Sequence, residues 1–230
     1  MKKVLVSVTT LKGTDWARQI EDLKKLNLSE FAVFVSALPK EIRPRLYEKL
    51  EKTTPDAIIP FVHARSDMPL AEYKYWQERW GTQKFNLHPR RGFPWQYDLS
   101  SLKDCLYIEN SGEGDDLLSD EDLIGAAGIC LDTAHLENTR LLHPEGYDAV
   151  VAILKKYPIG CNHLSAIANK RHDSSGVERY DAHTMTNLSE YNYLKQFSSE
   201  YFGEFMAIEL TNSIADQLKA KEYIDSIIAL

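Results

Sequence analysis

The sequence predicts a (β/α)8 TIM barrel, in which eight parallel strands alternate with helices in a single domain spanning residues 1–230. The chain contains eight short β-rich runs, and segments with helical periodicity lie between most of them. This alternation is typical of a parallel sheet covered by helices. A doubly wound open sheet is the alternative, but it would require a glycine-rich turn after an early strand, and "VSVTTLKG" is a poor match.

The predicted strands consist of neighbouring apolar residues rather than strictly alternating ones, as expected of strands that are buried on both faces. A typical barrel of this class has about 250 residues, so this slightly shorter chain should contain few insertions. In chain order the predicted strands are Val4–Val8, Phe31–Phe34, Ala57–Val62, Lys84–Leu87, Cys105–Ile108, Gly128–Leu131, Ile159–Asn162 and Phe205–Ile208.

Apolar residues spaced three or four apart predict the helices. The first two apolar stripes begin at Trp16 and Ile42, and Thr14 is the expected N-cap of the first helix. The stretch "PRRGFPWQYDLSSL" (89–102) is expected to be mostly loop. The other predicted helices are "LAEYKYWQERW" (70–80), "LLSDEDLIGAAG" (117–128), "PEGYDAVVAILKKYP" (144–158), "NLSEYNYLKQFSSEYF" (187–202) and "SIADQLKAKEYIDSIIAL" (213–230).

Composition points to an ordinary globular protein, with 43% hydrophobic and 27% charged residues. No apolar run is long enough to span a membrane, and the apolar stretch near the N-terminus is shorter than the ~7–15 residues that a signal peptide needs. Cys105, Cys130 and Cys161 lie in apolar segments without CxxC spacing, so we expect buried thiols rather than disulfides. These features predict a cytoplasmic protein without membrane contact and leave its oligomeric state open.

Histidines and carboxylates follow six of the eight predicted strands at the point where each ends, and five of the seven histidines fall there. TIM barrels build their active sites from these strand ends. A single histidine at such a place is often only a hydrogen-bonded loop residue, so the prediction depends on the joint pattern. The set comprises His63, His88, Glu109, Asp132, His135, His163, Asp181, His183 and Glu209.

This combination of side chains predicts a metal site. The four carboxylates would raise one another's pKa values unless cations lay among them. Imidazole and carboxylate ligands without thiolate suit Zn²⁺, Mn²⁺ or Fe²⁺. Because zinc takes about four ligands, nine donors predict two or three ions that share bridging carboxylates. Such a cluster can clamp the attacking and leaving oxygens of a phosphoryl displacement and generate hydroxide near neutral pH.

The motifs "PFVH", "FNLHP", "IENSGEG", "LDTAH", "NHLS", "DAH" and "IEL", in this order, resemble the ligand motifs of the endonuclease IV family (AP endonuclease family 2) within the xylose-isomerase-like barrel superfamily. The resemblance extends over nearly the whole barrel. It implies a trinuclear zinc site built from five histidines and four carboxylates. It also implies hydrolysis of the phosphodiester 5′ to abasic sites in DNA, which is a DNA-repair activity.

The resemblance further implies a role for each ligand. Glu109 would bridge two ions, and as the bridging ligand it is the expected group to orient the nucleophile. The other ligands divide into His63 and His88 on one side of the site, Asp132, His163 and Glu209 on a central ion, and His135, Asp181 and His183 on a third ion.

Four arginines near the predicted pocket are candidate phosphate contacts, with a role as solvated loop residues as the alternative. They are Arg65, Arg90, Arg91 and Arg179. The net charge of −7 does not exclude an anionic partner, because three Zn²⁺ ions would bring it to about −1. The expected partner is therefore DNA or a small phosphorylated substrate.

A sugar isomerase or epimerase of the same superfamily is the alternative function. It would hold one Mn²⁺-like ion, and Glu109 and Glu209 would transfer a proton on either face of a ketose. Its ligands would be Glu109, Asp132, His163 and Glu209, so the other five donors would be superfluous and their presence favours the hydrolase. A third possibility is a zinc-binding or DNA-binding barrel without catalysis, which would turn over no phosphoester.

Overall fold

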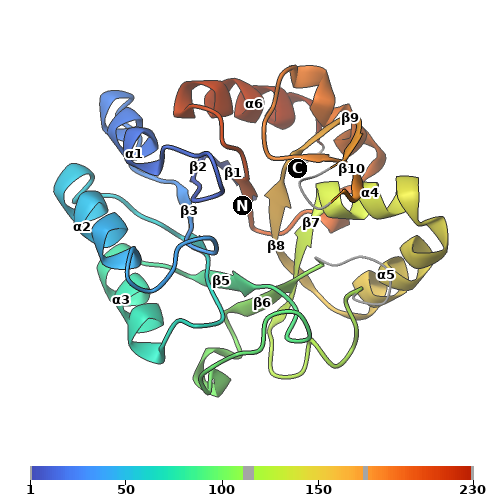
Figure 1. The fold of residues 1–230 in the computed structure, drawn as a ribbon, viewed down its shortest axis with the longest axis horizontal. Coiled ribbons are helices and arrows are strands. Elements are labelled where there is room, and N and C mark those ends of the chain that lie inside the picture. Colours follow the sequence, from blue (N-terminus) through green and yellow to red (C-terminus); the bar gives the residue numbers. More distant parts are fainter. Residues whose placement is uncertain (1, 111–116, 173–175, 229–230) are drawn as a thin grey trace.

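The computed structural model describes residues 2–110, 117–172 and 176–228, and these form a closed parallel barrel surrounded by helices (Figure 1). Hydrogen bonds connect the strands in the order β1-β11-β8-β7-β6-β5-β4-β3-β2. The N-terminal segment closes the sheet, because it contributes both ends of this order. Its first part, β1, pairs with β11, and its second part, β2, which follows after Val6, pairs with β3. The strands of the barrel are β1 (Lys3–Leu5), β2 (Ser7–Val8), β3 (Ala32–Phe34), β4 (Phe61–His63), β5 (Lys84–Leu87), β6 (Leu106–Glu109), β7 (Gly128–Asp132), β8 (Ile159–Leu164) and β11 (Phe205–Ile208).

The helices pack outside the barrel but do not cover it evenly. Figure 1 shows α1, α2 and α3 along the left, α6 at the top beside α1, and α4 and α5 at the right. On the remaining side, the connection from β5 to β6 contains only the short 3-10 helix η1 (Ser100–Leu102). The helices are α1 (Trp16–Lys25), α2 (Arg43–Thr53), α3 (Leu70–Trp80), α4 (Thr133–Leu142), α5 (Pro144–Lys156) and α6 (Ile214–Ile227), and two further 3-10 helices are η3 (Leu188–Gln196) and η4 (Ser199–Tyr201).

Successive strand residues alternate between the helices and the barrel interior, as the two-residue period of a strand requires. Ile108 and Leu131 belong to the core between sheet and helices. Tyr107, Cys130 and Cys161 belong to a separate apolar cluster formed by the other face of the strands. All three cysteines are free thiols; Cys130 and Cys161 are buried, as predicted, whereas Cys105 is only partly buried. No helix among the described residues is both long and apolar enough to cross a membrane.

The predicted fold class is confirmed, and most predicted strands agree with the structure within one or two residues. The third strand is an exception, because it forms only at Phe61–His63 instead of across Ala57–Val62. Pro60 has no N–H group to contribute to a ladder, which explains why the strand starts after it. Ile58 makes only an isolated bridge to Glu30.

The helix predicted at 117–128 is wrong, because the described residues there form turns. Asp122 accepts hydrogen bonds from the backbone N–H and the hydroxyl of Ser119 at 3.0 and 2.7 Å. This contact has the form of a capping box, but the backbone bonds that follow it run only from residue i to residue i−3, as in turns. Gly125 then adopts φ +79°, which ends any helical path. The segment 187–202 likewise forms the 3-10 helices η3 and η4 instead of an α-helix.

Two helix starts differ from the prediction. Asp15, not Thr14, is the N-cap of α1, and its side chain accepts a hydrogen bond from the backbone N–H of Arg18. Helix α4 was not predicted, although Asp132 is a good N-cap residue directly after a strand.

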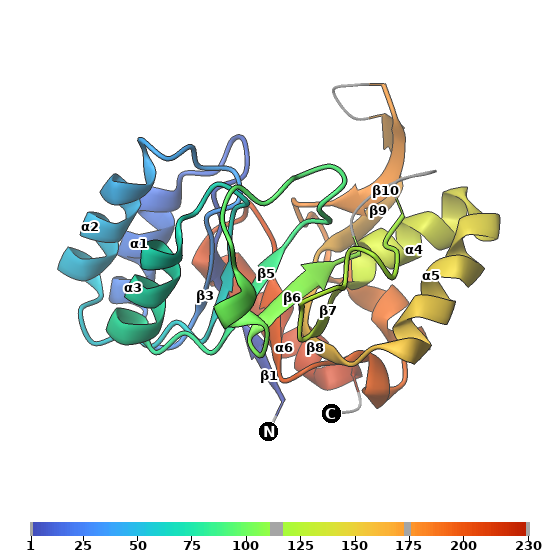
Figure 2. The same ribbon diagram turned by 90° about the horizontal axis from the view of Figure 1, so that it is seen from below.

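An antiparallel hairpin was also not predicted. It consists of β9 (Ala166–His172) and β10 (Glu178–Ala182), and Figure 2 shows it projecting beyond the body of the barrel. Its base contacts α4 and η3, so residues on β10 are carried to the rim of the barrel next to the carboxyl end of β7.

Candidate metal centre

The nine predicted ligands come from the carboxyl ends of the barrel strands and the segments that follow them. The strand register explains part of their proximity, because Asp132 pairs directly with His163 across β7 and β8. Glu109 pairs with Cys130, which lies two residues before Asp132 on the same face of β7. His63, Glu109, Asp132, His163, Asp181 and Glu209 are buried, whereas His88, His135 and His183 line the more open side.

Glu109 is the common neighbour of four histidines. Its Oε2 atom lies 3.6 Å from His63 Nε2 and 3.8 Å from His88 Nε2. The same oxygen is 3.4 Å from His163 Nδ1, and Oε1 is 3.5 Å from His135 Nε2. Contacts on both carboxylate oxygens are what a bridging ligand requires.

His163 is the common neighbour of three carboxylates. Its Nδ1 atom lies 3.4 Å from Glu109 Oε2, 3.5 Å from Glu209 Oε2 and 3.9 Å from Asp132 Oδ2. These four residues form the innermost part of the site, and each of them is buried.

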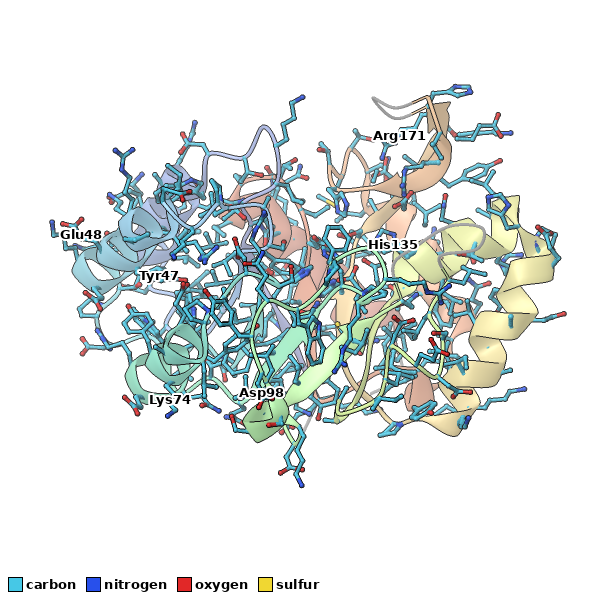
Figure 3. All side chains as sticks on the ribbon, turned by 60° about the horizontal axis from the view of Figure 1, so that its bottom comes forward. Tyr47, Glu48, Lys74, Asp98, His135 and Arg171 are labelled. Atoms are coloured by element: carbon cyan, nitrogen blue, oxygen red, sulfur yellow. The ribbon has the colours of Figure 1, made fainter. Side chains whose placement is uncertain are left out.

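Asp181 is brought to the site by the hairpin. Its Oδ2 atom contacts His135 Nδ1 at 3.0 Å, and Figure 3 shows His135 near the barrel centre and Arg171 on the projecting hairpin. His183 lies farther away, with its ring centroid 6.3 Å from that of His135. Its Nδ1 atom instead lies 3.2 Å from Ser165 Oγ and 3.9 Å from Glu209 Oε2.

The donors fit divalent metal ions. Three sets of residues each offer ligand atoms within 4.8 Å of one another among the described residues, and His135, Asp181 and His183 do not form a fourth. Several buried donor atoms have no hydrogen-bond partner, namely both ring nitrogens of His63, His163 Nδ1, Asp132 Oδ2 and Asp181 Oδ1. Buried polar atoms without partners are costly, and ligation would satisfy them. The three sets are His63, His88 and Glu109; His63, His163 and Glu209; and Glu109, Asp132 and His163.

When no cation is bound, protons on His163 and His135 balance part of the negative charge of the carboxylates. Burial lowers the pKa of His163, but Glu109, Glu209 and Asp132 outweigh burial and raise it to about 9. Burial also opposes protonation of His135, yet the nearby carboxylates, with Asp132 first among them, raise its pKa well above the ordinary value. His63 behaves oppositely, because burial holds its pKa well below the ordinary value.

The carboxylates correct one expectation. The sequence predicted that the carboxylates raise one another's pKa values. The pKa of Glu209 is raised, but burial is the main cause, and Glu109 and Asp132 only add to it. Burial would also raise the pKa of Glu109, but His163, His88 and His135 reverse the effect and hold it well below the ordinary value. The pKa of Asp181 is lowered like that of Glu109. Burial would raise it, but His135 and Arg179 outweigh burial and lower it to about 2. The histidines, placed between the acids, supply the compensating charge.

Aromatic rings form the floor of the site. The ring of Phe34 lies 4.8 Å from that of His163 and 5.4 Å from that of His63, measured between centroids. Phe61 lies 5.7 Å from His163. A floor of this kind keeps the imidazoles in fixed orientations and keeps water out from below.

Asn86 is a site residue that the sequence did not reveal. It is fully buried on β5, and it donates from Nδ2 to Glu109 Oε2 at 3.1 Å. Its Oδ1 atom lies 3.2 Å from His163 Nε2. A usable signal was present, because a polar residue within an apolar strand, two positions before His88, shares the interior face with it.

The arginines that were predicted to contact phosphate form hydrogen bonds or ion pairs with other protein groups in the structure. Arg65 donates to Asp67 Oδ2 at 3.2 Å and to the backbone oxygen of Ser36 at 2.9 Å. Burial lowers the pKa of His88, and the charge of Arg65 acts in the same direction. Arg179 lies 3.4 Å from Asp181 Oδ2.

Arg90 and Arg91 instead hold the connection between β6 and β7. The guanidinium of Arg90 lies 3.6 Å above the ring of Trp95 and donates to the backbone oxygen of Ile124 at 2.9 Å. Arg91 donates to the backbone oxygen of Leu117 at 3.3 Å. Of the four candidates, Arg65 and Arg179 are therefore the ones that remain beside the ligands.

Comparisons with known proteins show which fold this is. No protein-family model matches the chain, and no curated protein is significantly similar to it. Among solved structures, endonuclease IV from Thermus thermophilus is 16% identical, with a TM-score of 0.51 over 98% of this chain and 100% of that one. A xylose isomerase domain protein from Planctomyces limnophilus is 14% identical, with a TM-score of 0.53 over 98% and 96% of the two chains. The resemblance to these barrels is thus confirmed for the fold.

Proposed function

We propose that this chain is a metal-dependent phosphodiesterase that holds two or three Zn²⁺ ions and cleaves DNA at abasic sites or a related phosphoester. The observation that carries the proposal is the position of Glu109 between four histidines, with contacts to both of its carboxylate oxygens. A single-ion site would not use His63, His88 and His135 around one carboxylate.

The nine donors divide the work between them. Bound divalent ions would supply Lewis acidity and lower the pKa of water. Glu109, with contacts on both carboxylate oxygens, would be the ligand that the ions share and would help to orient the attacking water. His63 and His88 would hold the more open side, where His88 is partly exposed and a substrate can approach. Arg65 and Arg179 at the rim would attract and orient a phosphate group.

Metal analysis and substrate assays together test the proposal. The protein is purified, loaded with Zn²⁺ and analysed for metal content, and is then incubated with a duplex that contains one abasic site and with a small aryl phosphodiester. We expect two to three zinc equivalents and cleavage of at least one of the two substrates. Zinc binding with no turnover of either phosphoester would overturn the hydrolase.

The variant His88→Ala sharpens this test. It removes one donor of the Glu109 group and should lower phosphoester cleavage by more than about 100-fold, in line with the losses that metal-site substitutions cause. His143, which directly follows α4, provides the matched control, because among the described acidic side chains it contacts only Glu145. The variant His143→Ala should keep full activity.

A sugar isomerase or epimerase is the second candidate. It is favoured by the contacts of His163 Nδ1 with Glu109, Asp132 and Glu209, the four ligands that such an enzyme would use for one ion. In that enzyme Glu109 and Glu209 would transfer a proton on opposite faces of a ketose. One Mn²⁺ equivalent with ketose turnover, and full activity in His88→Ala, would establish this function in place of the hydrolase.

A further inference from the structure

Asn86 connects two strands that are not neighbours. It lies on β5 and reaches His163 on β8, although β6 and β7 separate these strands in the sheet. The contact therefore passes through the barrel interior. Asn86 is completely buried, as is His163, so neither side chain exchanges this partner for water.

The chemistry of Glu109 fixes the orientation of the Asn86 amide. An ionised carboxylate can only accept hydrogen bonds, so the group that faces Glu109 Oε2 must be the amide NH₂. The amide oxygen of Asn86 then faces His163 Nε2, at 3.2 Å. Because this oxygen can only accept, Nε2 of His163 must carry the hydrogen.

We propose that Asn86 is a positioning residue that fixes His163 with its proton on Nε2, so that Nδ1 is left as the metal-binding atom, and that it holds Glu109 Oε2 in place at the same time. The proposal rests on the metal centre proposed above. It agrees with the surroundings of Nδ1, which has three carboxylates within 4 Å and no hydrogen-bond partner. Hydrogen bonds of this kind to the second ring nitrogen are a general means of orienting ligating histidines.

Measurement of zinc affinity tests the role. In Asn86→Leu, an apolar side chain of similar volume replaces the amide, so both hydrogen bonds are lost. We expect zinc affinity, measured by competition with a chromophoric chelator, to fall by about 10-fold to 100-fold. Gln217→Leu is the matched control, because Gln217 is equally buried and all of its hydrogen bonds go to backbone atoms. Its zinc affinity should stay within about twofold of the wild type.

Stability measurements separate positioning from simple support of the fold. Both variants should lower the free energy of unfolding measured without metal, since each removes buried hydrogen bonds. Only Asn86→Leu should also weaken zinc binding by the folded protein. Equal zinc affinity in Asn86→Leu and the wild type would show that Asn86 is merely structural and would overturn the proposal.

Nuclear magnetic resonance of the wild type provides a test that needs no variant. In zinc-loaded protein with ¹⁵N-labelled histidine, His163 should show its proton on Nε2 and the metal-induced shift on Nδ1. The reverse assignment would overturn the role of Asn86 while leaving the metal centre intact. A wild type that binds no zinc at all would overturn the metal centre and, with it, this inference.

Discussion

The interior of the barrel has two levels built from the same strands, and they differ in chemistry. At the lower level, apolar residues such as Phe61, Tyr107 and Ala207 fill the interior. Two residues farther along, the same strands present polar groups at the upper level. The pairs are Phe61 and His63, Tyr107 and Glu109, Cys130 and Asp132, Cys161 and His163, and Ala207 and Glu209.

The difference shows how a stable apolar level can support a level of buried polar groups that is unfavourable by itself. The lower level is closely packed and its side chains have no unmet hydrogen-bonding needs, so it stabilises the barrel. The upper level contains unpartnered atoms on His63, Asp132 and His163, which cost stability until a ligand satisfies them. Rigid support beneath a strained site is a general requirement for precise ligand geometry. The two levels should therefore respond differently to substitution.

The largest effect on stability should come from the lower level. Phe205 is buried there, and Phe205→Ala should lower the free energy of unfolding by about 3–5 kcal/mol, as truncation of a core phenylalanine typically does. Urea unfolding in the presence of a chelator measures this loss. The folded fraction should still bind the full complement of zinc. Loss of zinc without loss of stability would contradict the separation of the two levels. If Phe205→Ala does not fold, Phe205→Leu should show a smaller loss in the same direction.

At the upper level, Asp132 has two roles that a single substitution separates. Its Oδ1 atom caps α4 by accepting from the backbone N–H groups of Ala134 and His135, whereas Oδ2 has no partner. Asparagine caps helices as well as aspartate does. Asp132→Asn should therefore keep α4 while lowering zinc affinity by about 100-fold.

Hydrogen exchange of the Ala134 and His135 amides and a chelator competition measure these two roles. Asp15→Asn is the matched control, because Asp15 caps α1 in the same way but is not one of the nine ligands. It should bind zinc like the wild type. Protection lost at α4 with zinc affinity unchanged would reverse the assignment of the two oxygens.

The sequence predicted this upper level well because parallel barrel strands all end on one side. Once the strands were placed, Glu109, Asp132 and His163 had to meet at their carboxyl ends. Asp181 and His183 were also expected there, although the hairpin that carries Asp181 was not. In "AIANKRH" and "ERYDA" polar residues predominate, so neither segment has the apolar run that identifies a barrel strand.

Features that depend on local competition could not be predicted from periodicity. The segment 117–128 has helix-forming residues and a capping-box contact between Ser119 and Asp122, but Gly125 at φ +79° interrupts any helix there. At Asp132 a helix was missed. The residue was interpreted only as a metal ligand, although it also caps α4. Asn86 was missed for a different reason, which is long-range contact. Its partners Glu109 and His163 lie 23 and 77 residues away, and only the closed barrel brings them together.

The protons at the upper level predict how zinc binding depends on pH. The folded-state pKa of His163 is about 9, above its ordinary value of 6.5, so the stability from its ion pairs is fully present below pH 6.5 and is lost as pH rises through 9. Zinc must displace this proton and the one on His135, so affinity should increase over the same range by at least about tenfold per pH unit.

Calorimetry in buffers of different ionisation enthalpy should detect about two protons released per protein near pH 7. Unfolding of the zinc-free protein at pH 6.5 and pH 9.5 measures the opposite trend in stability. Zinc binding without proton release would mean that the histidines are neutral beforehand, contrary to the contacts described for His163 and His135.

The smallest effect should come from the rim above the upper level. Arg65 is held by Asp67, whose other oxygen accepts from the buried Arg43 at 2.8 Å. This connection to the core fixes the guanidinium before substrate arrives. Arg65→Ala should therefore raise KM for a phosphodiester by about tenfold, the value of one charge-assisted hydrogen bond, with kcat changed much less.

Steady-state kinetics with the substrate that the wild type cleaves measures this split. Arg79→Ala is the control, because Arg79 packs over Trp80 and donates to the backbone oxygen of Pro55, away from the ligands. Arg65→Lys should recover only part of the affinity, since an ammonium group cannot reproduce the forked contacts to Asp67 and Ser36. If Arg65→Ala instead lowers kcat and leaves KM unchanged, the guanidinium acts on the reacting group itself, and the rim cannot be treated as separate from the polar level beneath it.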